Sequence, residues 1–301
     1  MVRDRSFRVG FIGAGRAARA LAVGLHGKGY QVSAVASRTP ASAEALASHI
    51  RGCTPLKRPQ DVAHSCDLVF ITTPDDTIPS VAREVPWRKG MSVVHCSGAE
   101  SLGVLEAARE QGASVGSFHP MQTFSGVPGE EASLSGVAFA VEGDSPLVDT
   151  LKEMANALGG WPVEIDPRDR PLYHLSGFLA CGAVVTLLAR SSELWEVMGY
   201  SREQGLDVLI PLLQSTVDSI KARGAAGALT GPISRGDIGT VRKHLDSLER
   251  QAPTVLPLYC QVALSTAALA REKGGIDDNR ERELLDLLEE RLARASRQFV
   301  S

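Results

Sequence analysis

Two polar clusters follow apolar runs in the sequence, and each contains a histidine. They are His95-Cys-Ser-Gly98 and Phe118-His-Pro-Met-Gln-Thr-Phe124. A histidine near its ordinary pKa can donate or accept a proton at neutral pH, which suits chemistry at an oxygen or nitrogen atom. We therefore predict that His119 is a general acid or base and that Ser97 bonds to it or to the substrate. Gln122 and Thr123 are predicted to orient a polar substrate group.

A structural interpretation stands beside this catalytic one. A histidine at a strand end commonly satisfies a backbone carbonyl, and His95, which stands closer to a buried strand, fits that interpretation better than His119. Cys96 is interpreted as a small packing residue, because no base dedicated to it stands nearby. No cluster has metal-ligand spacing, so no metal site is predicted.

A glycine-containing turn precedes both clusters. Gly13, Gly15 and Ala18 follow the apolar run Val9–Ile12 with the G-x-G-x-x-A spacing of a dinucleotide-binding turn. The first glycine permits a tight turn and the second lets the backbone approach a pyrophosphate, while the helix N-terminus offers N–H groups to phosphate. We predict cofactor contacts from the whole turn, namely Gly13, Ala14, Gly15, Arg16 and Ala17.

The end of the second predicted strand indicates which dinucleotide binds. NAD-binding domains carry Asp or Glu about 20 residues after the glycine turn, to bind the ribose 2′-hydroxyl. Here the strand ends in Ser37, Arg38 and Thr39, and arginine suits a 2′-phosphate. We predict NADP(H), with Thr73 and Pro74 as further contacts after the third strand. A solvated arginine and a plain turn are the alternatives.

A sheet must position these residues. Short apolar runs alternate with Ala- and Leu-rich helical runs, which predicts an α/β fold with a doubly wound parallel sheet of Rossmann type over residues 1–166. Because the carboxyl ends of parallel strands share one edge, the glycine turn and both histidine clusters are expected to meet there. Strands are predicted over residues 9–12, 31–37, 67–72, 92–95, 114–118, 137–142 and 162–165.

The remaining chain, residues 167–301, begins with a polar linker and is otherwise predicted to be helical. The first helix carries long apolar runs from Leu175 to Ala189 and is expected to be buried on several sides, which favours a homodimer through this domain. A capping box at Ser201 and Gln204 predicts the start of the second helix. Helices are predicted over residues 172–198, 201–222, 240–249, 253–273 and 280–299.

Further substrate contacts are predicted from the helical region. His174 stands at the start of the first helix, where it either faces the interdomain cleft or caps the helix in water. The glycine-rich connection 223–237 is longer than most interhelical connections. It is either a solvent loop or a segment that brings Thr230, Arg235 and Asp237 to the substrate.

Composition limits the possible partners. The net charge is −3 with mixed signs, which gives no electrostatic reason to expect nucleic acid or an anionic membrane. The five cysteines form no C-x-x-C pair and are expected to be reduced. The first residues have no signal-peptide pattern, and no apolar run is expected to reach the roughly 20 residues that span a bilayer. We expect a soluble, cytoplasmic protein.

Five segments together resemble the bacterial family that joins a Rossmann-like domain to a DUF2520 domain. That family is similar to pyrroline-5-carboxylate reductases, coenzyme-F420-dependent NADP reductases and other 6-phosphogluconate-dehydrogenase-like enzymes. The resemblance covers nearly the whole chain and implies an N-terminal NADP domain and a helical domain that dimerises, but no particular substrate. The segments begin at Gly10 (Gly-Phe-Ile-Gly-Ala-Gly-Arg), Thr72 (Thr-Thr-Pro-Asp-Asp), His95 (His-Cys-Ser-Gly-Ala), Ser117 (Ser-Phe-His-Pro-Met-Gln-Thr-Phe) and Leu229 (Leu-Thr-Gly-Pro-Ile-Ser-Arg-Gly-Asp).

A weaker similarity concerns mechanism. Prephenate dehydrogenases carry a His-Pro-Met motif whose histidine handles the substrate hydroxyl with help from a serine, which implies these roles for His119 and Ser97. The second domain differs, so aromatic biosynthesis does not follow. Ketopantoate reductases need a lysine early in the helical domain, and residues 172–198 contain none.

These observations predict an NADP(H)-dependent oxidoreductase that moves a hydride to or from a small polar carbonyl or imine, expected to bear a carboxylate. Arg235 and His174 would bind the substrate anion. A non-catalytic NADP(H)-binding regulator or scaffold is one alternative, and a deazaflavin-linked NADP reductase is another.

Overall fold

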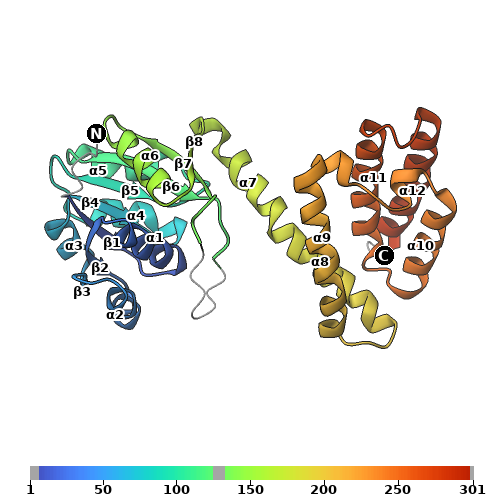
Figure 1. The fold of residues 1–301 in the computed structure, drawn as a ribbon, viewed down its shortest axis with the longest axis horizontal. Coiled ribbons are helices and arrows are strands. Elements are labelled where there is room, and N and C mark those ends of the chain that lie inside the picture. The colour runs from blue at the N-terminus through green and yellow to red at the C-terminus, as the bar shows by residue number, and fades with distance from the viewer. Residues whose placement is uncertain (1–6, 125–132, 299–301) are drawn as a thin grey trace. The chain divides into compact units, whose positions relative to one another are not determined.

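The computed structural model describes residues 7–124 and 133–298, and the chain divides into two compact units (Figure 1). Unit 1 is Met1–Cys181 and unit 2 is Gly182–Ser301. This division lies some residues beyond the predicted boundary at 166–167. Phe299, the predicted end of the last helix, lies outside the described residues. Residues 1–6, which lack a signal-peptide pattern, lie outside them too.

Unit 1 contains an eight-stranded sheet in the order β3-β2-β1-β4-β5-β6-β7-β8. The predicted α/β fold is confirmed, but the sheet is not parallel throughout, because β6 and β7 pair antiparallel. Antiparallel neighbours need no crossover helix between them. The short strand β3 was not predicted. The strands are β1 (Arg8–Ile12), β2 (Gln31–Ala36), β3 (Thr54–Leu56), β4 (Leu68–Ile71), β5 (Ser92–His95), β6 (Ser114–Pro120), β7 (Ala138–Gly143) and β8 (Trp161–Glu164).

Helices cover both faces of the sheet. On one face, α1 (Arg16–Gly27), α2 (Pro40–Ser48) and α6 (Leu147–Ala157) bury leucines against a row of aromatic rings. The other face is covered by α3 (Pro59–Ser65), α4 (Ile78–Glu84) and α5 (Glu106–Glu110). Within the aromatic row, the ring centroids of Phe11 and Phe70 lie 5.2 Å apart, and those of Phe118 and Phe139 lie 4.7 Å apart. Each buried phenylalanine contributes about 1.5–3 kcal/mol, so this row holds the strands that carry the polar ends.

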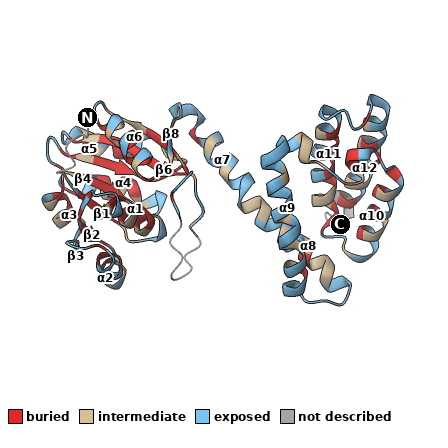
Figure 2. Cartoon of the chain, viewed as in Figure 1, coloured by how far each residue is buried: buried red, intermediate tan, exposed pale blue. Residues whose placement is uncertain are grey.

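The helix predicted over residues 172–198 is two helices, α7 (Arg170–Ala180) in unit 1 and α8 (Gly182–Val197) in unit 2. Cys181 separates them with φ −123° and ψ −63°. The prediction that this stretch is buried is wrong for the single chain. Phe178 is 55% exposed and Val185 is 67% exposed, and much of α8 and α9 is drawn as exposed in Figure 2.

The same stretch corrects the expectation that no segment is long and apolar enough to span a bilayer. Pro167–Val197 is long and apolar enough to cross a membrane by length and composition alone. The most apolar stretch within it has a mean hydropathy of 1.7, and none of that stretch is buried. Glycine, serine and histidine interrupt the apolar residues, but no Asp, Glu, Lys or Arg stands between residues 172 and 189. The average hydropathy is therefore high although no long apolar run exists.

Unit 2 is helical. Its core lies among α10 (Ile238–Gln251), α11 (Leu256–Glu272) and α12 (Asp278–Gln298). The predicted capping box is confirmed at the start of α9 (Arg202–Ala228). Because α9 continues to Ala228 across a kink at Gly224, the connection before α10 is shorter than the predicted 223–237 segment. A 3-10 turn, η4 (Ile233–Arg235), occupies part of it.

Candidate active site at the carboxyl ends of the strands

The glycine turn joins β1 to α1, and its geometry requires glycine at its first position. Gly13 has φ +110°, and a Cβ there would lie 2.6 Å from the carbonyl oxygen of Thr72. A Cβ on Gly15, in contrast, would meet nothing within 4 Å. Gly15 is the N-cap of α1 and has no side chain to satisfy the N–H groups of the first turn. The open space beside these N–H groups is suited to a phosphate.

The next two strand ends supply polar groups on the same edge. Arg38 follows β2 with its side chain exposed, and the structure shows no ion pair for it within the described residues. Ser37 Oγ accepts a hydrogen bond of 3.3 Å from the backbone N–H of Thr39. After β4, the hydroxyl of Thr72 donates to the carbonyls of the glycine turn. The hydroxyl of Thr73 is buried without a partner, as a ligand-binding group would be.

Ser97 bonds to Asp75 and not to His119, the first of its two predicted partners, while its bond to the substrate stays a prediction. Its hydroxyl donates a hydrogen bond of 2.6 Å to Asp75 Oδ2, and it accepts bonds from the backbone N–H groups of Ala99 and Glu100. The expected bond to His119 is absent from the described contacts. Asp75 belongs to η1 (Asp75–Thr77), directly after Pro74, so this bond connects the end of β4 to the end of β5.

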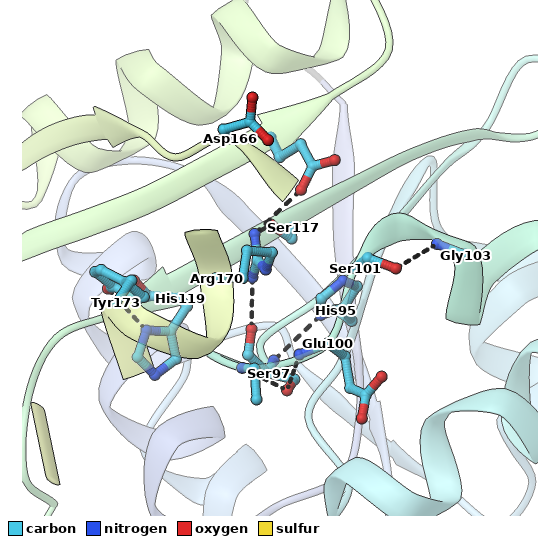
Figure 3. Close-up of polar contacts among 12 residues, drawn as sticks. His95, Ser97, Glu100, Ser101, Gly103, Ser117, His119, Asp166, Arg170 and Tyr173 are labelled. Carbon is cyan, nitrogen blue, oxygen red and sulfur yellow. Dashed lines mark hydrogen bonds and ion pairs between the residues drawn. The ribbon is translucent and has the colours of Figure 1, made fainter. Parts of the chain in front are cut away.

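His119, near the end of β6, is bonded to a residue that the sequence did not indicate. Its Nδ1 lies 2.9 Å from the hydroxyl of Tyr173 on α7, and Figure 3 shows the two side chains facing each other. Burial is the main reason why the pKa of His119 falls from 6.5 to about 4, with smaller contributions from His174 and Arg170. The ring is therefore neutral at pH 7, whereas the prediction relied on an ordinary histidine pKa.

His174 lies beside His119 on α7 and is exposed, and whether it faces the substrate stays a prediction. Their ring centroids are 6.1 Å apart. Gly98 packs against both rings, since a Cβ there would come within 2.7 Å of His174 Cδ2 and 2.8 Å of His119 Nε2. Glycine is therefore required at this position for the two imidazoles to approach each other.

Arg170 is the main residue that the sequence analysis missed. It stands in the segment interpreted as a polar linker, yet its side chain is only 1% exposed. Its guanidinium donates to Ser117 Oγ at 2.8 Å, to the carbonyl oxygen of Ser97 at 2.8 Å and to Glu142 at 3.2 Å (Figure 3). Burial raises the pKa of Glu142, and the adjacent guanidinium opposes that rise. These bonds attach the first turn of α7 to β6, to β7 and to the loop after β5.

His95 supports the turn that contains Ser97. Its Nδ1 accepts a hydrogen bond of 3.2 Å from the backbone N–H of Ser97. Burial, with Arg170 and His119, lowers the pKa of His95 to about 3. Cys96 is held as a thiol because burial raises its pKa well above the ordinary value. Cys96 matches its interpretation as a packing residue. His95 has a structural contact as well, but as an acceptor from a backbone N–H and not as a donor to the expected carbonyl. No group of three or more candidate metal ligands is found among the described residues.

The remaining predicted substrate residues have mostly local contacts. Gln122 donates to the carbonyl of Ser133 and accepts from the backbone N–H of Thr123, so its amide is used within its own loop. Asp237 caps α10 by accepting from Thr240. Thr230 and Arg235 are exposed in unit 2, and their approach to the substrate stays a prediction.

The fold and these strand ends define a Rossmann-type α/β domain followed by a helical domain. Two family models match the chain side by side. A Rossmann-like domain matches residues 1–120, and a domain of unknown function, DUF2520, matches residues 137–266. The chain combines these two domains, as its motifs predicted.

Similar proteins include NADP oxidoreductases. The structure of a candidate NADP oxidoreductase from Bacteroides fragilis is 26% identical, with a TM-score of 0.73 over 88% of this chain and 99% of that one. A protein from Thermotoga maritima is 25% identical, with a TM-score of 0.69 and the same coverage. Pyrroline-5-carboxylate reductase 3 from Bos taurus is 38% identical over 79 residues, which span only 26% of either chain.

Proposed function

We propose that this protein is an NADP(H)-dependent oxidoreductase acting on a small polar carbonyl or imine that bears a carboxylate. The observation that carries the proposal is the set of hydrogen bonds that join neighbouring strand ends between the glycine turn and His119. Thr72 bonds to the turn, Asp75 bonds to Ser97, and Arg170 joins Ser97 to α7 and its Tyr173. A nucleotide cradle and a proton-handling pair therefore share one edge of the sheet.

The residues present fit a nicotinamide dinucleotide. The N-terminus of α1 and the open space at Gly15 would hold the pyrophosphate, and Arg38 would hold a 2′-phosphate. The unpartnered hydroxyl of Thr73 would donate to the cofactor. When bound, the nicotinamide supplies or accepts the hydride. The names of the similar proteins, an NADP oxidoreductase and a pyrroline-5-carboxylate reductase, support this cofactor and this class of reaction.

The chain's own part in the reaction is proton handling and orientation. A neutral His119 donates a hydrogen bond through the ring nitrogen that bears the proton, and it accepts a proton from an alcohol or amine in the reverse direction. His174, beside it, is suited to the substrate carboxylate. The two terminal nitrogens of Arg170 are bonded within the protein, and through these bonds the residue positions α7.

A panel assay of NADPH oxidation tests the proposal, using 2-oxo acids, cyclic imines and a deazaflavin, with NADH in parallel. We expect His119→Ala to abolish turnover of the active substrate while NADPH affinity, measured by fluorescence titration, is unchanged. His49→Ala, which changes an exposed histidine, is the matched control. Turnover retained by His119→Ala would remove this residue from the mechanism. NADPH binding without turnover of any substrate would favour a regulator, and reduction of the deazaflavin alone would favour that alternative.

We also propose that the protein forms a homodimer through its helical unit. Exposed apolar side chains occur along α8 and α9, among them Val185, Val208, Ile210 and Leu212, each more than half exposed. A water-soluble chain rarely leaves so many exposed apolar side chains unpaired. Light scattering coupled to size exclusion is expected to give twice the 32.0 kDa chain mass. Leu212→Glu is expected to shift the mass to that of the monomer, and a monomeric wild type would contradict the proposal.

A further inference from the structure

The two ring nitrogens of His119 have different surroundings. Nδ1 lies 2.9 Å from the hydroxyl of Tyr173. For Nε2, the contacts among the described residues include no hydrogen-bond partner. Gly98 lies beside Nε2, and a Cβ there would come within 2.8 Å of this nitrogen. Nε2 is therefore the ring nitrogen that has no bond within the described residues and that a substrate could use.

Which acceptor the Tyr173 hydroxyl donates to determines which nitrogen of His119 bears the proton. The hydroxyl has two acceptors within reach, Nδ1 of His119 at 2.9 Å and the carbonyl oxygen of the same residue at 3.4 Å. If the hydroxyl donated to the carbonyl, Nδ1 would carry the proton and donate to the hydroxyl oxygen. That carbonyl contact is at the outer limit of hydrogen bonding, which favours donation to Nδ1 instead. Donation to Nδ1 requires that nitrogen to be unprotonated, which places the proton of the neutral ring on Nε2.

We propose that Tyr173 is a positioning residue that holds His119 as the tautomer protonated on Nε2, so that the site donates a hydrogen bond to an uncharged acceptor on the substrate. The acceptor is a carbonyl oxygen or a neutral imine nitrogen. A protonated iminium has no lone pair to accept this bond and is not recognised. This inference rests on the proposed function for its substrate, but the tautomer itself does not depend on it.

The surrounding charges agree with an uncharged acceptor. The neighbouring groups that lower the pKa of His119 are His174 and Arg170 from α7. His119 in turn lowers the pKa of His95. The positive charge of Arg170 opposes protonation of His119, and it opposes a cationic substrate nitrogen for the same reason.

The proton balance for a carbonyl follows from this arrangement. Hydride adds to the carbonyl carbon, the π electrons move to oxygen, and that oxygen takes the proton from Nε2. Nδ1 takes the hydroxyl proton of Tyr173, so the ring stays neutral, and the tyrosinate then takes a proton from water. Burial raises the pKa of Tyr173 to about 12, so a tyrosinate takes back a proton quickly. The nearby Arg170 opposes that rise and stabilises the tyrosinate while it exists.

The tautomer can be read without any substrate. Long-range ¹H–¹⁵N correlation spectra of the full chain, with and without NADPH, distinguish protonated from unprotonated imidazole nitrogens. We expect unprotonated Nδ1 and protonated Nε2 for His119 in the wild type, and a mixture of tautomers in Tyr173→Phe. The opposite tautomer in the wild type would overturn the proposal, as would an unchanged spectrum in the variant. The wild-type spectrum decides the matter even if the variant does not fold.

Kinetics test the substrate class. We expect reduction of a 2-oxo acid but not of an N-methyl cyclic iminium salt of similar size, which cannot accept a hydrogen bond. Tyr173→Phe is expected to lower kcat about a hundredfold with little change in KM, and to alter the pH profile of kcat. Tyr200→Phe, in unit 2, is the matched control.

Faster reduction of the iminium salt would overturn the substrate assignment. No turnover of any probe would count against the proposed function, while the spectra would still decide the tautomer.

Discussion

The guanidinium of Arg170 donates a hydrogen bond of 2.8 Å to the carbonyl oxygen of Ser97. These residues are 73 positions apart in the sequence. The bond joins the first turn of α7 to the loop after β5, and Tyr173 stands one helical turn beyond it. The placement of Tyr173 beside His119 therefore depends on an arginine that is buried under the site.

Replacing this arginine is expected to be costly. Arg170→Met leaves Glu142 and the Ser97 carbonyl without their partner, and breaking a buried pair in this way costs about 3–5 kcal/mol of unfolding free energy. Urea unfolding followed by tryptophan fluorescence measures the loss. Arg168→Met changes an exposed arginine two residues away and is expected to have no measurable effect. The double variant Arg170→Met with Glu142→Gln should regain part of the loss. Equal stability of Arg170→Met and Arg168→Met would contradict the role of the buried pair.

The glycine between the two histidines provides a second prediction. Gly98→Ala places a Cβ within 2.7–2.8 Å of His174 and His119, so at least one ring must move. We expect turnover to fall at least tenfold while NADPH affinity is unchanged, because the cradle at Gly15 is formed by other strands. Gly103→Ala, whose Cβ would lie 3.4 Å from its nearest neighbour, is the control. Full activity in Gly98→Ala would show that these imidazoles need not lie so close.

A third prediction concerns cofactor choice. Arg38→Ala removes the cation proposed to bind a 2′-phosphate, and a hydrogen bond to a charged group contributes about 1.5–3 kcal/mol. NADPH affinity is therefore expected to fall roughly 10- to 100-fold, with NADH affinity unchanged. Fluorescence titration of both cofactors measures the difference. A parallel loss for both would show that Arg38 does not discriminate between them.

Acid should destabilise the fold through its buried histidines. His119 has a pKa of about 4 in the folded chain and 6.5 as its ordinary value, so between these values the unfolded chain binds more protons. The contribution of the neutral His119 ring to the unfolding free energy is fully present above pH 6.5 and is lost as the pH falls towards 4. His95, with a pKa of about 3, acts in the same direction. His119→Gln is expected to flatten the fall in unfolding free energy between these values, measured by urea midpoints, whereas the exposed-residue control His49→Gln should keep it. An identical slope in both variants would refute the assignment.

Local backbone demands made part of this site predictable. Gly13 and Gly15 were identified because a tight turn before a helix needs glycine at that spacing, and the structure has φ +110° at the first of them. His119 was placed at the working edge because parallel strands end together. Both inferences depend on neighbours in sequence or on the general geometry of a sheet.

Partners distant in sequence were not predictable. Arg170 stands in a polar segment that matches a linker, and only the folded chain brings it to Ser117, 53 positions away. The same holds for Asp75, which accepts a hydrogen bond from the Ser97 hydroxyl, and for Tyr173, which bonds to His119. The break at Cys181 was also missed, because the apolar pattern continues across it without proline. Burial decides the pKa of His119, and burial is a property of the assembled fold.

The bonds of Thr72 have a consequence for the thermodynamics of cofactor binding. Its hydroxyl lies 3.2 Å from the carbonyl oxygen of Ile12 and 3.1 Å from that of Gly13, and its backbone N–H also bonds to Ile12. The phosphate-facing turn is thus held by an adjacent strand before any ligand arrives. The loss of backbone entropy for this turn occurs during folding, so dinucleotide binding need not order it again. Calorimetry should therefore find only a small unfavourable contribution to the entropy of dinucleotide binding. Amide exchange at Gly13 should already be slow in the ligand-free protein.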